Sequence, residues 1–460
     1  MRCCSCLAAL FVVTQVCVAA DGNSDWHHWR GPTANGASAA EANPPTEWSA
    51  TKNVKWKIEV PGKGSSTPII SGNQIILLTA IKTERTKQAA FPAASNSIFA
   101  MQQEPGGRQR GQRGQRRGGR RGFGGGPAPT NIYEFVVASY DRSNGKELWK
   151  TVVAEQVPHE AGHRDNTFAS SSPVTDGKHI YVSFGSRGIH CLDMKGNKVW
   201  KKDYGRMETR AKFGEGSSPA VHGDTVVVPW DHEGQSFIVA LDAKTGDEKW
   251  KKQRDERTTW ATPLIVEHEG RTQVITNGHQ VRSYDLANGD LIWECGGQVD
   301  NPIPSPVLMG DHVICMTGYK GNSVYAISLD SKGNVTDSDK VKWHRNDAAP
   351  YVPSPVLYKG QLYFLKSNNG ILSSVNATTG KATIEQSRLA GIRSVYSSPV
   401  AAADRIYLTG RDGSTLVLRH SDKLEVLATN KLGEPVDASP AIVGNELFLR
   451  GAKHLFCIAK

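Results

Sequence analysis

The sequence predicts an all-β protein, an eight-bladed β-propeller of four-stranded antiparallel blades. A Ser/Thr-Pro step followed by an apolar strand recurs eight times, and each copy continues into further strand-like runs separated by turns. A strand near the N-terminus fits a gap in the last copy. Six of the seven intervals between the recurring prolines span 41 to 49 residues, and the first spans 105 residues. The prolines are Pro68, Pro173, Pro219, Pro263, Pro306, Pro355, Pro399 and Pro440.

Each unit has the same internal order of four short strands with glycine-containing turns, which is typical of antiparallel sheet. The third strand ends in an aspartate that we expect to accept backbone N–H groups of the following turn, at Asp141, Asp193, Asp242, Asp285 and Asp330. The turn glycine supplies a positive φ, at Gly145, Gly196, Gly246 and Gly289. The fourth strand carries a tryptophan that we expect to fill the wedge between neighbouring blades, at Trp149, Trp200, Trp250, Trp293 and Trp343. Ile384 and Val426 are expected to take this place in units six and seven.

The ring is expected to close through the N-terminus. The eighth unit stops at "HLFCIAK" without a fourth strand, whereas "NVKWKIEV" carries Trp56 with no unit before it. Residues 53–60 therefore supply the missing strand, because an open ring would expose two sheet edges. The predicted propeller spans residues 53–460.

The long first interval contains "RQRGQRGQRRGGRRGFGGG" at residues 108–126, with seven arginines. A run with so little apolar surface and so much like charge is predicted to be disordered. We expect a loop insertion over residues 84–130, between the second and third strands of the first blade. The net charge of +10 falls to +3 without these seven arginines, so the rest of the chain is not markedly basic. This disfavours nucleic acid as a partner and leaves peripheral attachment to an anionic surface as a role for the run.

The N-terminus predicts export. Residues 1–20 combine one arginine, an apolar stretch from Leu7 to Val18 and small residues before a cleavage site after Ala20, as in a secretory signal peptide. Residues 21–52 form a lead-in segment, and no later segment is apolar enough to span a membrane. The cysteines that remain after cleavage are expected to be buried free thiols and show no metal-ligand spacing, at Cys191, Cys295, Cys315 and Cys457.

The repeat pattern "SPV…VYV…LD..TG…W" and the lead-in "WHHWRGPTANGAS" resemble the pyrroloquinoline-quinone (PQQ)-like propeller repeats of secreted bacterial proteins. The resemblance covers nearly the whole chain after residue 20. It implies a propeller with one of two roles. One is a dehydrogenase that binds PQQ, usually with calcium; the other is a non-catalytic binding propeller, similar to the scaffold subunit of the outer-membrane β-barrel assembly machinery. The fold alone does not choose between them.

Two departures from the dehydrogenase pattern favour the second role. The alcohol-oxidising enzymes that the chain resembles carry adjacent cysteines over the cofactor, whereas the Cys3–Cys4 pair lies in the predicted signal peptide. The stretch 330–340 places Lys332 where a calcium-binding loop requires an oxygen ligand. We therefore expect no cofactor and no catalytic residue, with PQQ and calcium as the alternative.

A binding site would lie at the central mouth of the propeller, where the loops entering the innermost strands meet the loops between strands two and three. Trp230 and Trp260 lie outside the repeat register, so packing between blades does not account for them. With the surrounding charges they suit an anionic or sugar-like ligand, although a solvated rim of charged side chains is the plainer interpretation. No metal is expected there, although His159, His163 and Asp165 could ligate one. The predicted mouth residues are His163, Arg164, Asp165, Arg187, Arg206, Arg210, Glu215, Trp230, Asp231, Glu233, Trp260, Arg393 and Arg411.

The sequence thus predicts a periplasmic or secreted monomer that acts as a binding or scaffold protein in the bacterial cell envelope. Its partner would be an envelope protein or an anionic or carbohydrate ligand. The alternative is a PQQ-type oxidoreductase that uses the central mouth, with Asp231 or Glu233 as the base.

Overall fold

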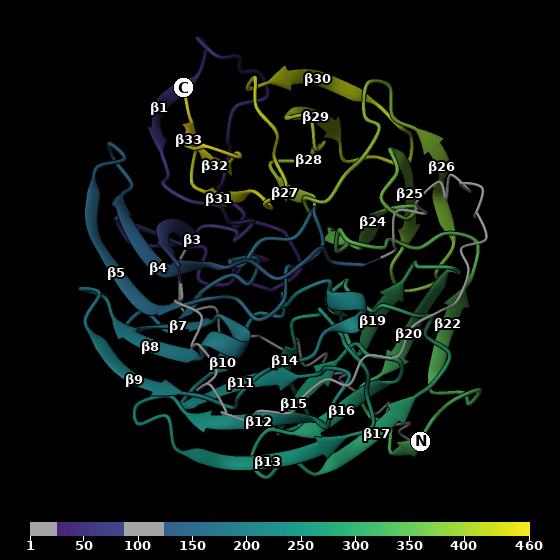
Figure 1. Cartoon of the computed structure of the whole chain (residues 1–460). Coiled ribbons are helices and arrows are strands. Elements are labelled where there is room, and N and C mark those ends of the chain that lie inside the picture. The colour runs from purple at the N-terminus through teal and green to yellow at the C-terminus, as the bar shows by residue number, and fades with distance from the viewer. Residues whose placement is uncertain (1–24, 87–123) are drawn as a thin grey trace, which may run out of the picture.

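The protein is an eight-bladed β-propeller (Figure 1). The computed structural model describes residues 25–86 and 124–460, which form eight sheets of four antiparallel strands each, one of them extended by a fifth strand. This confirms the predicted fold class. The predicted signal peptide and most of the Arg/Gly run lie outside the described residues. Within the described ranges no helix is long and apolar enough to cross a membrane.

The first four blades follow the chain in order. Blade 1 contains β2 (Ile69–Ser71), β3 (Gln74–Thr86), β4 (Asn131–Asp141) and β5 (Glu147–Gln156). Blade 2 contains β6 (Val174–Thr175), β7 (His179–Ser183), β8 (Ile189–Asp193) and β9 (Lys198–Lys202). Blade 3 contains β10 (Ala220–His222), β11 (Thr225–Trp230), β12 (Ser236–Asp242) and β13 (Glu248–Arg254). Blade 4 contains β14 (Leu264–His268), β15 (Arg271–Thr276), β16 (Val281–Asp285) and β17 (Leu291–Cys295).

The last four blades complete the ring. Blade 5 contains β18 (Val307–Met309), β19 (His312–Thr317), β20 (Ser323–Ser328) and β22 (Val341–Arg345). Blade 6 contains β23 (Val356–Tyr358), β24 (Gln361–Leu365), β25 (Ile371–Asn376) and β26 (Ala382–Arg388). Blade 7 contains β27 (Val400–Ala402), β28 (Arg405–Thr409), β29 (Ser414–Arg419) and β30 (Val426–Lys431). Blade 8 contains β31 (Ala441–Val443), β32 (Glu446–Arg450), β33 (His454–Ile458) and β1 (Val54–Glu59). Two short 3-10 turns, η1 (Gly185–Arg187) and η2 (Arg210–Lys212), lie in the loops.

The predicted closure is confirmed. Strand β1 pairs antiparallel with β33, with Trp56 opposite Cys457 and Ile58 opposite Leu455. The N-terminal strand therefore supplies the outermost strand of blade 8, and the first and last segments of the chain hold the ring shut.

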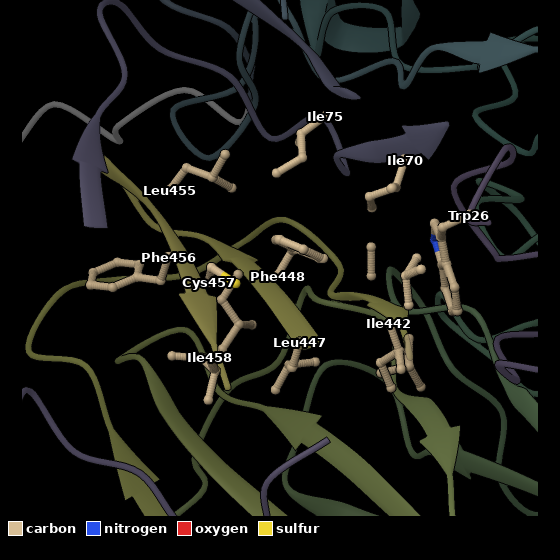
Figure 2. Close-up of a cluster of buried hydrophobic side chains, with 14 of the residues drawn as sticks. Trp26, Ile70, Ile75, Ile442, Leu447, Phe448, Leu455, Phe456, Cys457 and Ile458 are labelled. Carbon is tan, nitrogen blue, oxygen red and sulfur yellow. The ribbon is translucent and has the colours of Figure 1, made fainter. Parts of the chain in front are cut away.

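Strand composition follows the position of each strand within a blade. The second strands lie between neighbouring blades and are buried on both faces, so β11 and β19 are buried along their whole length. The outermost strands face solvent on one side, and β22 accordingly alternates partly buried and exposed residues. The apolar side chains between blades form the core, as in the cluster around Phe448, Cys457 and Trp26 (Figure 2).

The tryptophans of most outer strands join one blade to the next, as predicted. The indole of Trp149 lies against Gly196 of blade 2, where an added Cβ would come within 2.5 Å of the ring. Its N–H donates to the carbonyl of Met194 at 3.1 Å. Trp200 contacts Gly246 and Ala243 of blade 3 in the same way. Glycine is thus required at this turn for two reasons. The backbone has a positive φ, and a side chain would collide with the tryptophan ring.

Two details of the repeat differ from the prediction. Ala428, and not Val426, holds the tryptophan position in blade 7, because Ala428 lies opposite Val417 after the bulge while Val426 is exposed. The longer turn of blade 5 contains β21 (Gly333–Asn334), which pairs in parallel with β17 of blade 4. Trp293 of β17 donates its N–H to Gln273 of its own blade and departs from the inter-blade pattern.

The lead-in segment crosses the innermost strands of several blades. Trp26 pairs with Ile70 of blade 1, Ala37 pairs with Ala401 of blade 7, and the carbonyl of Asn35 accepts the N–H of Leu357 in blade 6. These contacts bring the segment beneath the centre of the ring and tie together blades that are far apart in the sequence.

Candidate functional site

A central cavity of about 820 Å³ lies on the axis of the propeller. Its walls come from loops that lead into the innermost strands, and Trp29 of the lead-in contributes to its lining. The volume is within the range of ligand-binding pockets, ~300–1,000 Å³. Side chains that line it include Thr67, His163, Arg164, Asp165, Ser172, Phe213, Ser218, Trp260, Thr262, Tyr319, Tyr351, Tyr396, Ser398, Asp437 and Ser439.

The Ser/Thr-Pro steps form a ring of hydroxyl groups around this cavity, which we call the hydroxyl collar: Thr67, Ser172, Ser218, Thr262, Ser305, Ser354, Ser398 and Ser439. Six of these residues donate their backbone N–H to the hydroxyl of the next member. The distance is 3.0 Å from Thr67 to Ser172 and from Thr262 to Ser305, and 2.9 Å in the other four links. The recurring residue before proline is therefore an inter-blade link. In the linear sequence this residue is recognisable only as a marker of strand starts.

An arginine clamp stands at the mouth of the cavity. The guanidinium of Arg411 donates two hydrogen bonds to Asp437, at 2.7 and 3.0 Å, and a third to Asp165 at 3.1 Å. It also lies 4.0 Å from the ring centroid of Tyr396, whose hydroxyl donates to Asp165 at 3.2 Å. The clamp therefore joins the loops that precede blades 2, 7 and 8 and links both carboxylates to one cation.

The clamp determines the protonation of its members. Partial burial acts to raise the pKa of Asp165, but the hydrogen bond and charge of Arg411 outweigh burial and hold that pKa below its ordinary value. Burial, with the charge of Asp165, raises the pKa of Tyr396 to about 12. At neutral pH Asp165 is thus an ionised carboxylate with little capacity to accept a proton.

Aromatic side chains form much of the cavity wall. Tyr319 stacks on Tyr351 with ring centroids 4.8 Å apart. Phe213 meets His163 edge to face at 5.2 Å, and the indole N–H of Trp260 donates to the carbonyl of Gly214 at 2.7 Å. Because these rings are held by stacking or hydrogen bonds, they offer pre-formed apolar surfaces to a ligand.

Of the predicted mouth residues, the structure brings together His163, Arg164, Asp165 and Trp260 on the cavity lining, with Arg411 bound to Asp165. Arg210 forms an ion pair with Asp300 at 3.1 Å. Arg206 and Arg393 are exposed.

The other predicted residues lie outside the lining of this cavity and contact other protein groups. Arg187 pairs with Glu215 at 2.8 Å. Trp230 packs against Phe237 with centroids 5.9 Å apart. Glu233 accepts a hydrogen bond from the Thr258 hydroxyl at 2.8 Å.

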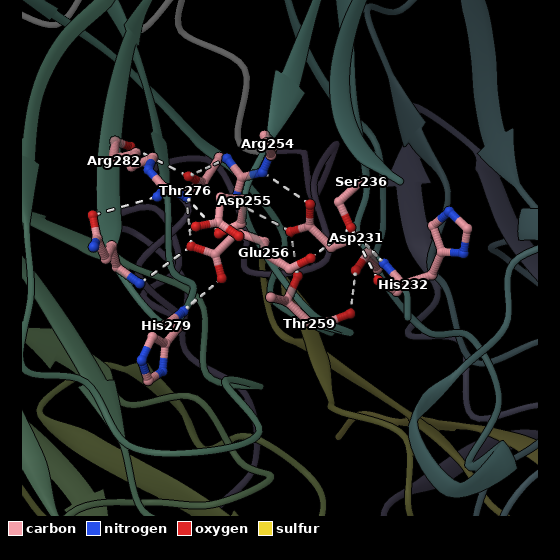
Figure 3. A network of polar contacts seen from close by, with 12 residues as sticks. Asp231, His232, Ser236, Arg254, Asp255, Glu256, Thr259, Thr276, His279 and Arg282 are labelled. Carbon is pink, nitrogen blue, oxygen red and sulfur yellow. Dashed lines mark hydrogen bonds and ion pairs between the residues drawn. The ribbon is translucent and has the colours of Figure 1, made fainter. Parts of the chain in front are cut away.

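Asp231 belongs to a network between blades 3 and 4 (Figure 3). It accepts two hydrogen bonds from the fully buried Arg254, at 2.8 and 3.2 Å, and one from Thr259 at 2.7 Å. Glu256 of the same network pairs with Arg282 at 2.7 Å, and burial raises the pKa of Glu256. These contacts satisfy each charge with another protein group, which is the pattern of a structural network.

Sequence reasoning missed several residues that the fold brings to the cavity. Tyr351 and Asp437 lie a few residues before the recurring prolines Pro355 and Pro440, yet nothing in the linear pattern separates them from spacers. Trp29 was visible in the lead-in motif, but its place at the cavity depends on the path of the lead-in across the ring.

The described lining residues offer few ligands for a calcium ion that would hold a quinone cofactor. Calcium takes ~6–8 oxygen ligands, usually with several carboxylates. The carboxylates among the lining residues are Asp165 and Asp437, and the guanidinium of Arg411 binds both of them and would repel a cation. In residues 25–86 and 124–460 no group of three or more His, Cys, Asp or Glu side chains is arranged to hold a metal ion.

The ring of sheets and its axial cavity define the class of protein, a β-propeller with a central pocket. A family model described as outer membrane protein assembly factor BamB matches residues 134–383, which is more than half of the chain. The chain belongs to this family of PQQ-like β-propellers. No curated protein matches it.

Solved structures with a similar fold include two dehydrogenases. A europium-containing methanol dehydrogenase superposes with a TM-score of 0.59 at 10% identity, covering 93% of this chain and 89% of that one. The quinohemoprotein alcohol dehydrogenase from Comamonas testosteroni gives 0.60 at 10% identity, covering 95% and 81%. BamB from Moraxella catarrhalis gives 0.48 at 15% identity, covering 70% and 90%. At 10% identity the likeness to the dehydrogenases concerns the fold alone.

Proposed function

We propose that the protein is exported and acts as a non-catalytic binding or scaffold propeller in the bacterial cell envelope. Membership of a family described by an outer membrane assembly factor supports this role. The axial cavity, with its aromatic walls and paired charges, supports a binding site at the centre of the ring.

The observation that carries the proposal is the arginine clamp. A quinoprotein dehydrogenase needs a base to accept the substrate proton and oxygen ligands for its calcium ion. Asp165 and Asp437 are the carboxylates on the cavity lining, and both are bound to Arg411. Burial acts to raise the pKa of Asp165, but the hydrogen bond and charge of Arg411 lower it overall, which makes this carboxylate a weak base.

The alternative is a quinone-dependent oxidoreductase that uses the same cavity. Its support is the cavity itself, which has the volume and the aromatic walls to accept a flat cofactor. Under this alternative a protein group other than the clamped carboxylates would have to accept the substrate proton.

Adding PQQ and calcium to the purified protein distinguishes the binding or scaffold role from the oxidoreductase role. Purified protein incubated with PQQ and calcium should show no dye-linked oxidation of alcohols or sugars, and calorimetry should show no tight calcium-dependent PQQ binding. A quinoprotein dehydrogenase serves as the positive control. Turnover that is abolished by Trp260→Ala in a folded variant would overturn the proposal and establish the alternative.

Export and the binding of an envelope protein are tested by separate measurements. Mass spectrometry of the protein from its native host should find Asp21 at the N-terminus and the protein in the envelope or secreted fraction. Crosslinking in intact cells should recover an envelope protein bound to the propeller. A cytoplasmic protein with residues 1–20 retained would contradict the export step.

A further inference from the structure

The floor of the central cavity presents hydrogen-bond donors that the protein itself does not use. Six collar residues line the cavity: Thr67, Ser172, Ser218, Thr262, Ser398 and Ser439. In each of the four serines the hydroxyl oxygen accepts one backbone N–H, and no described group accepts its O–H. The hydroxyls of Thr67 and Thr262 have no hydrogen-bond partner among the described residues. A hydroxyl carries one donor and two acceptor positions, so all six keep a donor for a ligand.

A buried cation lies behind this floor. Arg30 is 0% exposed and donates to the carbonyls of Pro399 at 2.9 Å and Pro355 at 2.6 Å. Its guanidinium carbon is 5.4 Å from the ring centroid of Trp29, and Trp29 lines the cavity. No carboxylate in the described part of the chain forms an ion pair with Arg30. Burial lowers the pKa of Arg30 to about 9, so the side chain is still a cation at neutral pH.

The remaining polar groups near the floor do not offset this charge. The indole N–H of Trp29 is buried with no acceptor among the described residues, so it brings no negative charge near Arg30. The clamp at the mouth is close to neutral once Arg164 is included, since Arg164 and Arg411 balance Asp165 and Asp437. A buried charge without a counter-charge is unfavourable, and a bound anion would relieve that cost.

We propose that the central cavity binds a small sugar that carries a carboxylate or phosphate group, with the anionic oxygens on the hydroxyl collar above Trp29. The inference rests on the proposed binding role and names its ligand class. The hydroxyl donors bind the anionic oxygens, and Arg30 supplies the attracting field. The faces of Tyr351 and Trp260 pack against the ring of the sugar.

The ligand class is tested by calorimetric titration of the purified protein in calcium-free buffer. The probes are glucuronate, glucose 6-phosphate, glucose and inorganic phosphate. At least one of the two anionic sugars should bind ten-fold or more tightly than glucose. The comparison of glucuronate with glucose 6-phosphate distinguishes a carboxylate from a phosphate site, and inorganic phosphate should compete for it. Equal binding of glucose, or binding of none of the four, overturns the proposal.

The position of the site is tested with collar variants. Thr67→Val and Thr262→Val together remove two donors without changing side-chain shape, and affinity for the anionic sugar should fall at least ten-fold. Thr378→Val makes the same chemical change in an exposed turn of blade 6 and should leave affinity unchanged. Unchanged affinity in the double variant would put the anion elsewhere and overturn the proposal.

The role of the buried charge is tested at Arg30. Arg30→Met should lose the anion selectivity, whereas Arg30→Lys should retain it in part. If Arg30→Met does not fold, the double variant Thr67→Val and Thr262→Val still tests whether the anion binds at the collar. Dye-linked turnover with PQQ would refute the non-catalytic role while leaving anion binding in calcium-free buffer intact, so the two proposals fail separately.

Discussion

Replacing Trp56 with alanine tests whether the N-terminal strand holds the ring closed. Trp56 lies on the outermost strand of blade 8 and is partly buried against Phe448 of the same blade, with ring centroids 6.1 Å apart. Across the blade boundary its ring lies against Gly145, and its N–H donates to the carbonyl of Arg142 at 3.0 Å. One side chain therefore joins the last blade to the first.

The expected cost follows from these contacts. Truncation of a buried aromatic side chain to alanine costs ~3–5 kcal/mol. Because Trp56 is only partly buried, we expect the lower end, about 3 kcal/mol, and the lost hydrogen bond accounts for ~1 kcal/mol of it. Trp56→Phe keeps most of the ring contact and should cost about 1 kcal/mol.

The assay is equilibrium urea unfolding followed by far-ultraviolet circular dichroism, which does not depend on the removed indole. Trp200→Ala, at an internal blade boundary, is the matched comparison and should cost a similar amount. If Trp56→Ala costs no more than Trp56→Phe, or well under 1 kcal/mol, the closing contact does not stabilise the ring and the reasoning is wrong.

Three further outcomes are expected. Gly246→Ala should destabilise the protein by ~1–3 kcal/mol more than Gly270→Ala. An added Cβ at Gly246 would lie 2.7 Å from Trp200, whereas Gly270 has a similar positive φ and open space around it. Equal losses of stability in urea unfolding would contradict the contact between Gly246 and Trp200. Replacing residues 104–123 with a short Gly/Ser linker should leave the melting temperature nearly unchanged, since loop length contributes only ~0.6 kcal/mol per doubling; a large loss of stability would refute the loop-insertion prediction. The folded-state pKa of Asp165 is lowered, so its stabilising contribution is present above the ordinary aspartate pKa and is lost as pH falls through the lower folded value. The stability difference between wild type and Asp165→Asn should therefore shrink below about pH 4, and a difference that stays constant down to pH 3 would argue against the clamp.

The candidate site was predicted less completely than the fold. The predicted mouth residues include His163, Asp165 and Trp260, which do line the cavity, because loops that enter successive innermost strands must converge on the axis. They also include Trp230 and Asp231, which lie in packed or paired arrangements between blades. A tryptophan outside the repeat register is equally compatible with a pocket wall and with a local packing contact, and the choice depends on neighbours that are distant in the chain.

The sequence by itself determined the number of blades, their strand order and the closing strand. These features follow from local periodicity, since each turn glycine, strand alternation and outer tryptophan acts within about one repeat length. The tertiary structure decided which contacts form between different repeats at the centre of the ring. The hydroxyl collar exists because eight Ser/Thr-Pro steps meet on one axis, and the arginine clamp because Arg411 reaches an aspartate 246 positions away. The floor of the cavity likewise depends on Arg30 meeting the carbonyls of blades 6 and 7. The contacts of Arg411 and Arg30 leave no periodic trace, because hydrogen bonds and ion pairs depend on distance in space and not on separation along the chain.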